Sequence, residues 1–152
     1  MAGMRFLPAL LALLLIACDS PKPVEKTPVK EVRNDTLLLP ATDQVSVRVV
    51  QDHVLGEAKL PGGTFAEYES KGKKYQLFVI RTDGNQDAAL LLLTAKSLIE
   101  NPEYIAHMGG YAGTYKGAPF YTFAKLQFLA GVAGLPKDEA DTVARQFAAK
   151  IK

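Results

Sequence analysis

The chain is poor in the residues that carry most enzyme chemistry, because it has only one cysteine and two histidines. It also has little net charge, with a formal value of +2. A single cysteine cannot form an intrachain disulfide, so stability must come from an apolar core. Two histidines leave few candidates for a general base or a metal ligand. A nearly neutral chain lacks the basic face that nucleic-acid binding requires, and we expect no nucleic-acid partner.

Neither histidine has the neighbours that a catalytic or metal site needs. His53 follows Asp52 and His107 lies near Glu103, but each pair lacks a third ligand at useful spacing. The serines fall in predicted strands and a helix, outside the strained turn that exposes a nucleophile: Ser46, Ser70 and Ser97. We therefore predict no catalytic residue, no metal and no cofactor.

The N-terminal segment has the parts of a secretory signal: Arg5, an apolar run from residue 6 to 16, and a small residue, Ala17, before the lone Cys18. The run is too short to cross a hydrocarbon core of about 30 Å, which needs roughly 20 apolar residues. The sequence Leu15-Ile16-Ala17-Cys18 resembles the lipobox of bacterial lipoproteins.

That resemblance implies cleavage between Ala17 and Cys18 and attachment of diacylglycerol to the Cys18 sulfur, with further acylation, such as by palmitate, in many Gram-negative bacteria. The protein would be exported and held by lipid on the cell membrane, either the periplasmic face of the inner membrane or the outer membrane. Asp19 resembles the inner-membrane retention signal of enterobacterial lipoproteins. Two or three acyl chains give stable anchoring where one is marginal.

Composition divides the rest of the chain in two. Residues 18–36 are rich in proline and lysine and hold only isolated valines, which predicts a disordered tether after the signal peptide of residues 1–17. Residues 37–152 are long enough for one domain and too short for two. Any stabilising core must therefore lie in this single segment.

Hydrophobic periodicity predicts an α+β domain. Valines alternate with polar residues at 45–50, and residues 64–70 and 75–82 flank a turn at 71–73, which indicates a hairpin. A further turn is predicted at 60–63. Residues 77–80 are apolar on both faces, so that strand should be central. Three more strands are predicted at 111–115, 120–123 and 128–133.

Two helices complete the predicted domain. The first spans about 85–100, with Asp83 and Gln86 as a capping box and a buried stripe formed by Leu91, Ala95, Leu98 and Ile99. The second spans 136–151 and has apolar residues at helical intervals. An antiparallel sheet of hairpins with both helices packed on one face is the expected architecture. Residues 110–151 also resemble small bacterial domains of unknown function.

Aromatic residues gather between residues 104 and 128, and this density is the feature with most functional content. The glycines at 109–113 do not form a phosphate loop, because no helix follows and no lysine has the required spacing. We predict a recognition patch formed by Tyr111, Tyr115, Tyr121 and the turn residue Lys116. In the alternative interpretation, the phenylalanines fill the core and the tyrosines only keep their hydroxyls in water.

These patterns predict a membrane-anchored lipoprotein whose domain is a binding or interaction module at the cell envelope, in contact with the membrane through Cys18 and with an envelope protein. The alternative is a domain that binds a small molecule or lipid in a pocket between sheet and helices. An envelope hydrolase is a third hypothesis, for which the sequence offers no catalytic constellation.

Overall fold

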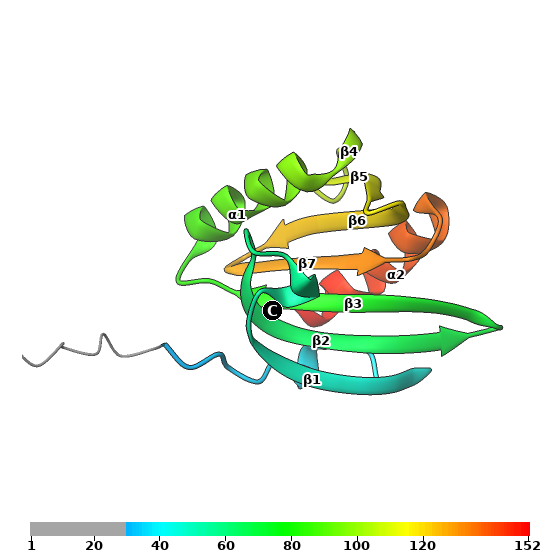
Figure 1. Cartoon of the computed structure of the whole chain (residues 1–152), viewed down its shortest axis with the longest axis horizontal. Coiled ribbons are helices and arrows are strands. Elements are labelled where there is room, and N and C mark those ends of the chain that lie inside the picture. Colours follow the sequence, from blue (N-terminus) through cyan, green and yellow to red (C-terminus); the bar gives the residue numbers. More distant parts are fainter. Residues whose placement is uncertain (1–29) are drawn as a thin grey trace, which may run out of the picture.

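The computed structural model describes residues 30–152. The signal peptide, the cleavage site, Cys18 and most of the predicted tether lie outside these residues. A seven-stranded antiparallel sheet with two helices packed on it forms the fold, which confirms the α+β prediction. Figure 1 shows the strands and helices in chain order by colour.

The elements are η1 (Thr36–Leu38), β1 (Gln44–Asp52), η2 (Val54–Gly56), β2 (Pro61–Ser70), β3 (Lys73–Arg81), α1 (Asn85–Leu98), β4 (Glu100–Ile105), β5 (Gly110–Tyr115), β6 (Ala118–Lys125), β7 (Phe128–Ala133) and α2 (Lys137–Lys150). The sheet order is β1-β2-β3-β7-β6-β5-β4, so two antiparallel meanders join where β3 pairs with β7.

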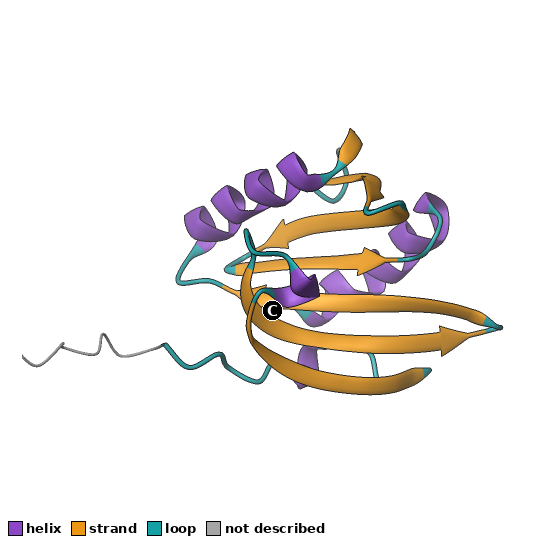
Figure 2. Ribbon diagram, viewed as in Figure 1, coloured by secondary structure: helices purple, strands orange, loops and turns teal. Residues whose placement is uncertain are grey.

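The two helices lie on opposite faces of the sheet, and the prediction that both pack on one face is wrong (Figure 2). Along β3, Leu77 and Val79 pack in the cluster that contains α2, whereas Phe78 and Ile80 pack in the cluster that contains α1. Successive strand residues point to opposite faces. A central strand that is apolar on both faces therefore needs cover on both faces. We call them the α1 face and the α2 face.

The predicted β2–β3 hairpin is confirmed. Lys71 and Gly72 at its turn both have positive φ, as expected for the tight turn that matches strand twist. The turn predicted at residues 60–63 is wrong, because β2 already begins at Pro61. A Cβ at Gly62 would lie 2.3 Å from the Gln51 carbonyl oxygen, so only glycine lets the backbones of β1 and β2 approach this closely.

Helix α1 covers the sheet with Ala88, Leu92 and Ala95, and Ile99 continues this stripe just beyond the helix. The stripe thus runs through Leu92 rather than through Leu91, which is only half-buried. The predicted capping box is also absent: Gly84 is the N-cap residue, without a side-chain cap, and the Asp83 carboxylate contacts Lys30 instead.

Helix α2 agrees with its prediction, with Ala140, Ala144, Phe147 and the following Ile151 buried. Strand β4 was not predicted, because its residues are mostly polar and exposed. It joins the sheet at the outer edge through β5. A chain segment without apolar alternation can still be a strand when a neighbour pairs with its backbone.

The domain begins earlier than residue 37. The Asp35 side chain is 5% exposed, forms an ion pair with Arg81, and its backbone N–H donates to Thr64 Oγ1 at 3.0 Å. Arg81 in turn lies over the Phe128 ring, 4.6 Å from its centroid. Contacts with the sheet on the α2 face therefore already include Asp35.

Candidate functional site

The structure divides the predicted recognition patch between the two faces. Tyr111 and Tyr115 alternate with Ala112 along β5 and pack on the α1 face, and Lys116 follows at the β5–β6 turn. Tyr121 is 1% exposed in the α2-face cluster. The prediction that Tyr121 belongs to an accessible patch is therefore wrong, and only Tyr115 and Lys116 lie at one open site.

That site is on the half of the α1 face that the helix leaves open. Helix α1 packs over β5, β6 and β7, while the chain between β1 and β2 folds onto the same face through the buried Val54. Between this connection and the β5–β6 turn lies a groove of about 460 Å³. We call it the aromatic groove. It is lined by Arg48, Val50, His53, Leu55, Gly56, Phe65, Gln76, Tyr115, Lys116, Ala118, Pro119, Phe120 and Ala133.

The base of the aromatic groove consists of aromatic rings fixed by one another. Phe120 stacks on Phe78 with 5.8 Å between centroids and meets Tyr115 at 5.2 Å in a tilted arrangement. Phe65 and Phe120 are both buried. Rings held in this way offer a rigid apolar surface, because little side-chain freedom remains to be lost when a ligand packs on them.

Two cations border this base. The Arg48 guanidinium lies 4.6 Å from the centroid of Phe65, and the Lys116 ammonium lies 5.1 Å from the centroid of Tyr115. Within residues 30–152, neither cation forms an ion pair with a carboxylate. Both positive charges are exposed and remain available to an anionic group on a ligand.

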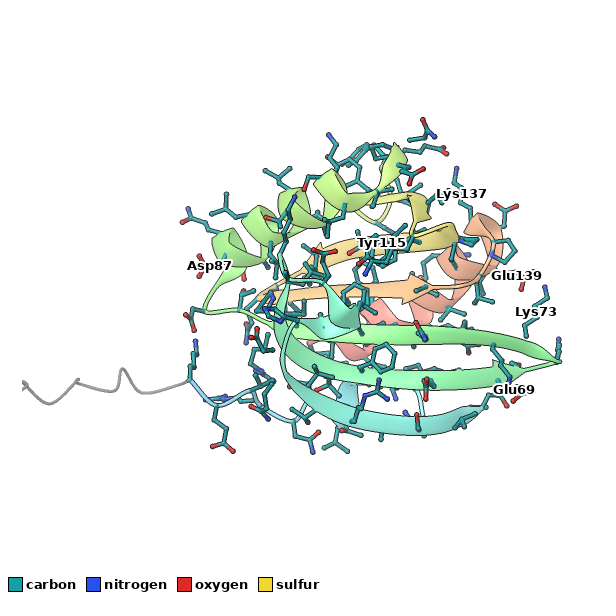
Figure 3. The ribbon with its side chains drawn as sticks, viewed as in Figure 1. Glu69, Lys73, Asp87, Tyr115, Lys137 and Glu139 are labelled. Carbon is teal, nitrogen blue, oxygen red and sulfur yellow. The ribbon has the colours of Figure 1, made fainter. Side chains whose placement is uncertain are left out.

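A hydrogen bond fixes one wall of the aromatic groove to the other. The Tyr115 hydroxyl donates to Glu57 Oε2 at 2.9 Å, linking β5 to the β1–β2 connection (Figure 3 labels Tyr115). A hydrogen bond from the backbone N–H of Lys59, followed by the one from Tyr115, lowers the pKa of Glu57. Burial raises the pKa of Tyr115, so its hydroxyl stays protonated and donates at neutral pH.

The backbone of the β1–β2 connection is strained where it borders the aromatic groove. His53 and Leu55 have φ values of 53° and 62°, in the left-handed region that bulky residues rarely adopt. Val54 between them is fully buried, which holds the strained residues in place. Such strain is typical of binding sites whose shape is set by the surrounding structure.

A second polar cluster lies on the α2 face around Asp141, and we call it the Asp141 cluster. Asp141 Oδ1 accepts hydrogen bonds from the Tyr121 hydroxyl and from His107 Nε2, both at 2.6 Å, and Arg145 Nε lies 3.1 Å from Oδ2. Partial burial favours the protonated acid, but the bonds from Tyr121 and His107 outweigh it and lower the pKa of Asp141.

This cluster links three parts of the fold rather than forming a reactive site. Tyr121 comes from β6, His107 from the β4–β5 turn, and Asp141 from α2. A carboxylate with a lowered pKa and three donors is a poor general base. Burial and the hydrogen bond to Asp141 raise the pKa of Tyr121, so this phenol is a poor nucleophile too.

Of the two histidine–acid pairs considered in the sequence, the structure keeps the first and changes the second. His53 Nε2 lies 3.3 Å from Asp52 Oδ2, whereas Glu103 contacts Lys137 and leaves His107 to Asp141. In the part of the chain that the structure describes, no group of three or more histidine, cysteine, aspartate or glutamate side chains is arranged to hold a metal. No helix among residues 30–152 has the length and apolar character to cross a membrane.

Sequence reasoning missed most of the aromatic groove. Arg48 and Phe65 are register partners on β1 and β2, and Phe120 comes from β6, so these three residues lie on three different strands. The one available signal was the alternation that puts Arg48 on the same face of its strand as Val50. No family model, no curated protein and no solved structure matches this chain.

Proposed function

We propose that the chain is a lipid-anchored protein of the bacterial cell envelope whose domain is a binding module, and that the aromatic groove is its recognition site. The observation that carries the proposal is a fixed aromatic base bordered by two exposed cations, neither of which forms an ion pair within residues 30–152. The pattern Leu15-Ile16-Ala17-Cys18 supports export and lipid attachment.

The groove chemistry favours a partner that carries a carboxylate or phosphate next to an apolar or aromatic group. Arg48 and Lys116 would bind the anion, while Phe65, Phe120 and Tyr115 would contact the apolar part. An exposed segment of an envelope protein satisfies this description. The open groove accommodates either such a segment or a small anionic amphiphile. We propose the interaction module first and keep the small anionic amphiphile as the alternative.

The two lysine turns of the chain provide a matched test. Lys116-Gly117 and Lys71-Gly72 have almost the same conformation, with φ values of 48° and 78° against 52° and 77°. Only the first borders the aromatic groove. We expect Lys116→Glu to abolish crosslinking of the full-length protein to its envelope partner, and Lys71→Glu to leave it intact. Equal crosslinking by both variants would show that the aromatic groove is not the recognition site.

Small anionic amphiphiles form the second arm of this test. Aryl carboxylates and aryl phosphates should raise the melting temperature in proportion to the logarithm of their concentration above Kd, and the corresponding neutral aryl alcohols should not. A large rise that Lys116→Glu removes, without any crosslinked protein, would establish the small-ligand alternative.

The anchor is tested separately. Cys18→Ser should leave an uncut, unlipidated precursor, because the thioether cannot form and cleavage follows lipidation in the lipoproteins that this segment resembles. Mass spectrometry of the mature N-terminus reads this directly. A Cys18→Ser chain that matures normally and remains on membranes contradicts the lipoprotein proposal.

A further inference from the structure

The two edges of the sheet are protected to different degrees. The β4 edge holds Pro102, two glutamates and a register irregularity between Glu100 and Glu103, and Asn101 has positive φ. These are the features by which sheet edges avoid pairing with other chains. The β1 edge is nine residues long and contains neither proline nor lysine. Its one irregularity lies at its start, between Gln44 and Ser46.

Strand β1 also exposes apolar side chains. Among residues 30–152 it pairs only with β2, so its outer row of backbone groups has no strand partner in this part of the chain. Val45 is 65% exposed, and Val47 is 36% exposed. Val47 pairs with Ala66 and so lies on the α2 face, where helix α2 does not reach β1. A long, regular edge with exposed valines is a template for strand addition.

We propose that β1 pairs with β1 of a second copy of this chain, antiparallel about a two-fold axis at Val47. The register is selected by charge. An axis at Arg48 would place two guanidinium groups directly opposite each other, which is destabilising. An axis at Val47 instead places Arg48 of each copy opposite Ser46 of the other, and a two-fold axis makes both contacts identical.

Ser46 connects this contact to Glu67 on the neighbouring strand. It is the register partner of Glu67, and its hydroxyl donates to Glu67 Oε2 at 2.6 Å. Arg48 of the second copy, placed opposite Ser46, therefore has the Glu67 carboxylate one strand further along the same face. Each copy supplies one cation and one anion, and the Val47 side chains of the two strands meet on the α2 face.

Pairing of one edge strand buries little surface, so this dimer is weak in dilute solution. Confinement of anchored chains to a membrane surface would raise their effective concentration. Arg48 takes part in both proposals, because it also lines the aromatic groove. Lys116 belongs only to the groove and Val47 only to the pairing, so variants at these two residues let the proposals fail separately.

Disulfide trapping in the full-length protein tests the axis. Residues directly opposite in an antiparallel pair have Cα atoms about 4.5–5.5 Å apart, within the range that a disulfide spans. With a mild oxidant we expect Val47→Cys to give a covalent homodimer at least tenfold more abundant than the parent chain gives. Leu93→Cys, 55% exposed on α1 away from the edge, is the matched control and should stay at the background level.

Charge reversal tests the register. Arg48→Glu in the Val47→Cys chain should lower trapping about tenfold, and Glu67→Arg added to it should restore trapping, which loss of folding could not do. Lys116→Glu, on the groove side, should leave trapping unchanged. Equal trapping at Val47 and Leu93, no rescue in the double variant, or a Val47→Cys adduct with a different protein would each overturn the proposal.

Discussion

The two faces of the sheet are covered to different extents. On the α2 face, η1 and α2 cover an apolar cluster that reaches from Leu39 through Phe147 to Ile151. On the α1 face, one helix covers one half and leaves an aromatic groove with exposed cations on the other. A domain of this size can close one face for stability and keep half of the other for recognition. The following predictions test this division.

The largest effect should come from the closed face. Phe147 is fully buried and meets Phe123 edge to face, with 6.1 Å between centroids. We expect Phe147→Ala to lower the free energy of unfolding by about 3–5 kcal/mol, because it leaves a cavity in a packed core. Urea denaturation measures the change. A loss below about 1 kcal/mol would show that α2 is not essential to the core.

The next effect tests the start of the domain on the same face. Asp35→Ala removes the buried carboxylate that pairs with Arg81 and leaves the guanidinium without it. We expect a loss of about 2–3 kcal/mol, since breaking a mostly buried ion pair leaves an uncompensated charge. Glu31→Ala, in the exposed chain just before it, is the control and should cost almost nothing. Equal stability of the two variants would place Asp35 outside the domain.

The Asp141 cluster should make the stability of the α2 face dependent on pH. The folded-state pKa of Asp141 is below its ordinary value of 3.8, so its contribution is complete above that pH and is lost as the pH falls through the lower, folded-state pKa. At pH 7 we expect Asp141→Asn to cost about 1–2 kcal/mol. The gap from the parent protein should narrow below pH 4. A gap that stays constant in acid would refute the ionised form as its source.

The smallest effect on stability should come from the open face. Tyr115→Phe removes only the hydroxyl that joins the two walls of the aromatic groove and keeps the ring on Phe120. We expect the melting temperature to change by about 2 °C or less, while ligand or partner binding weakens. Calorimetry and the crosslinking assay measure the two quantities on the same sample. A large loss of stability without loss of binding would reverse the division between the faces.

Local patterns predicted most elements of the fold. Lys71-Gly72 predicted the β2–β3 turn, and the spacing of Ala140, Ala144 and Phe147 predicted α2, because each signal lies within one turn or one helical face. The residues of β4 carried no such signal, because this segment becomes a strand only through its pairing with β5. The predicted capping box failed because the N-cap residue is Gly84, one residue after Asp83, and has no side chain to cap the helix.

The site was harder to predict than the fold. Strand alternation puts Phe120 and Tyr121 on opposite faces, yet it cannot say which face is open. That depends on where α1 lies, and the helix covers β5 to β7 instead of the first meander. Arg48 and Phe65 also become neighbours only through the β1–β2 register. The sequence had singled out Tyr115 and Lys116, but Arg48, Phe65 and Phe120 joined them only after the sheet from β1 to β5 was assembled.

The sequence by itself determined the strands other than β4, the two helices and the central place of β3, because period and turn chemistry act between residues close in the chain. Leu77 to Ile80 also required cover on both faces, although only the assembled sheet shows that each face receives one helix. The tertiary structure alone decided the pairing of β3 with β7, the burial of Tyr121 and the opening of the aromatic groove. These features arise from contacts between distant segments, whose energies depend on packing geometry that no local pattern carries.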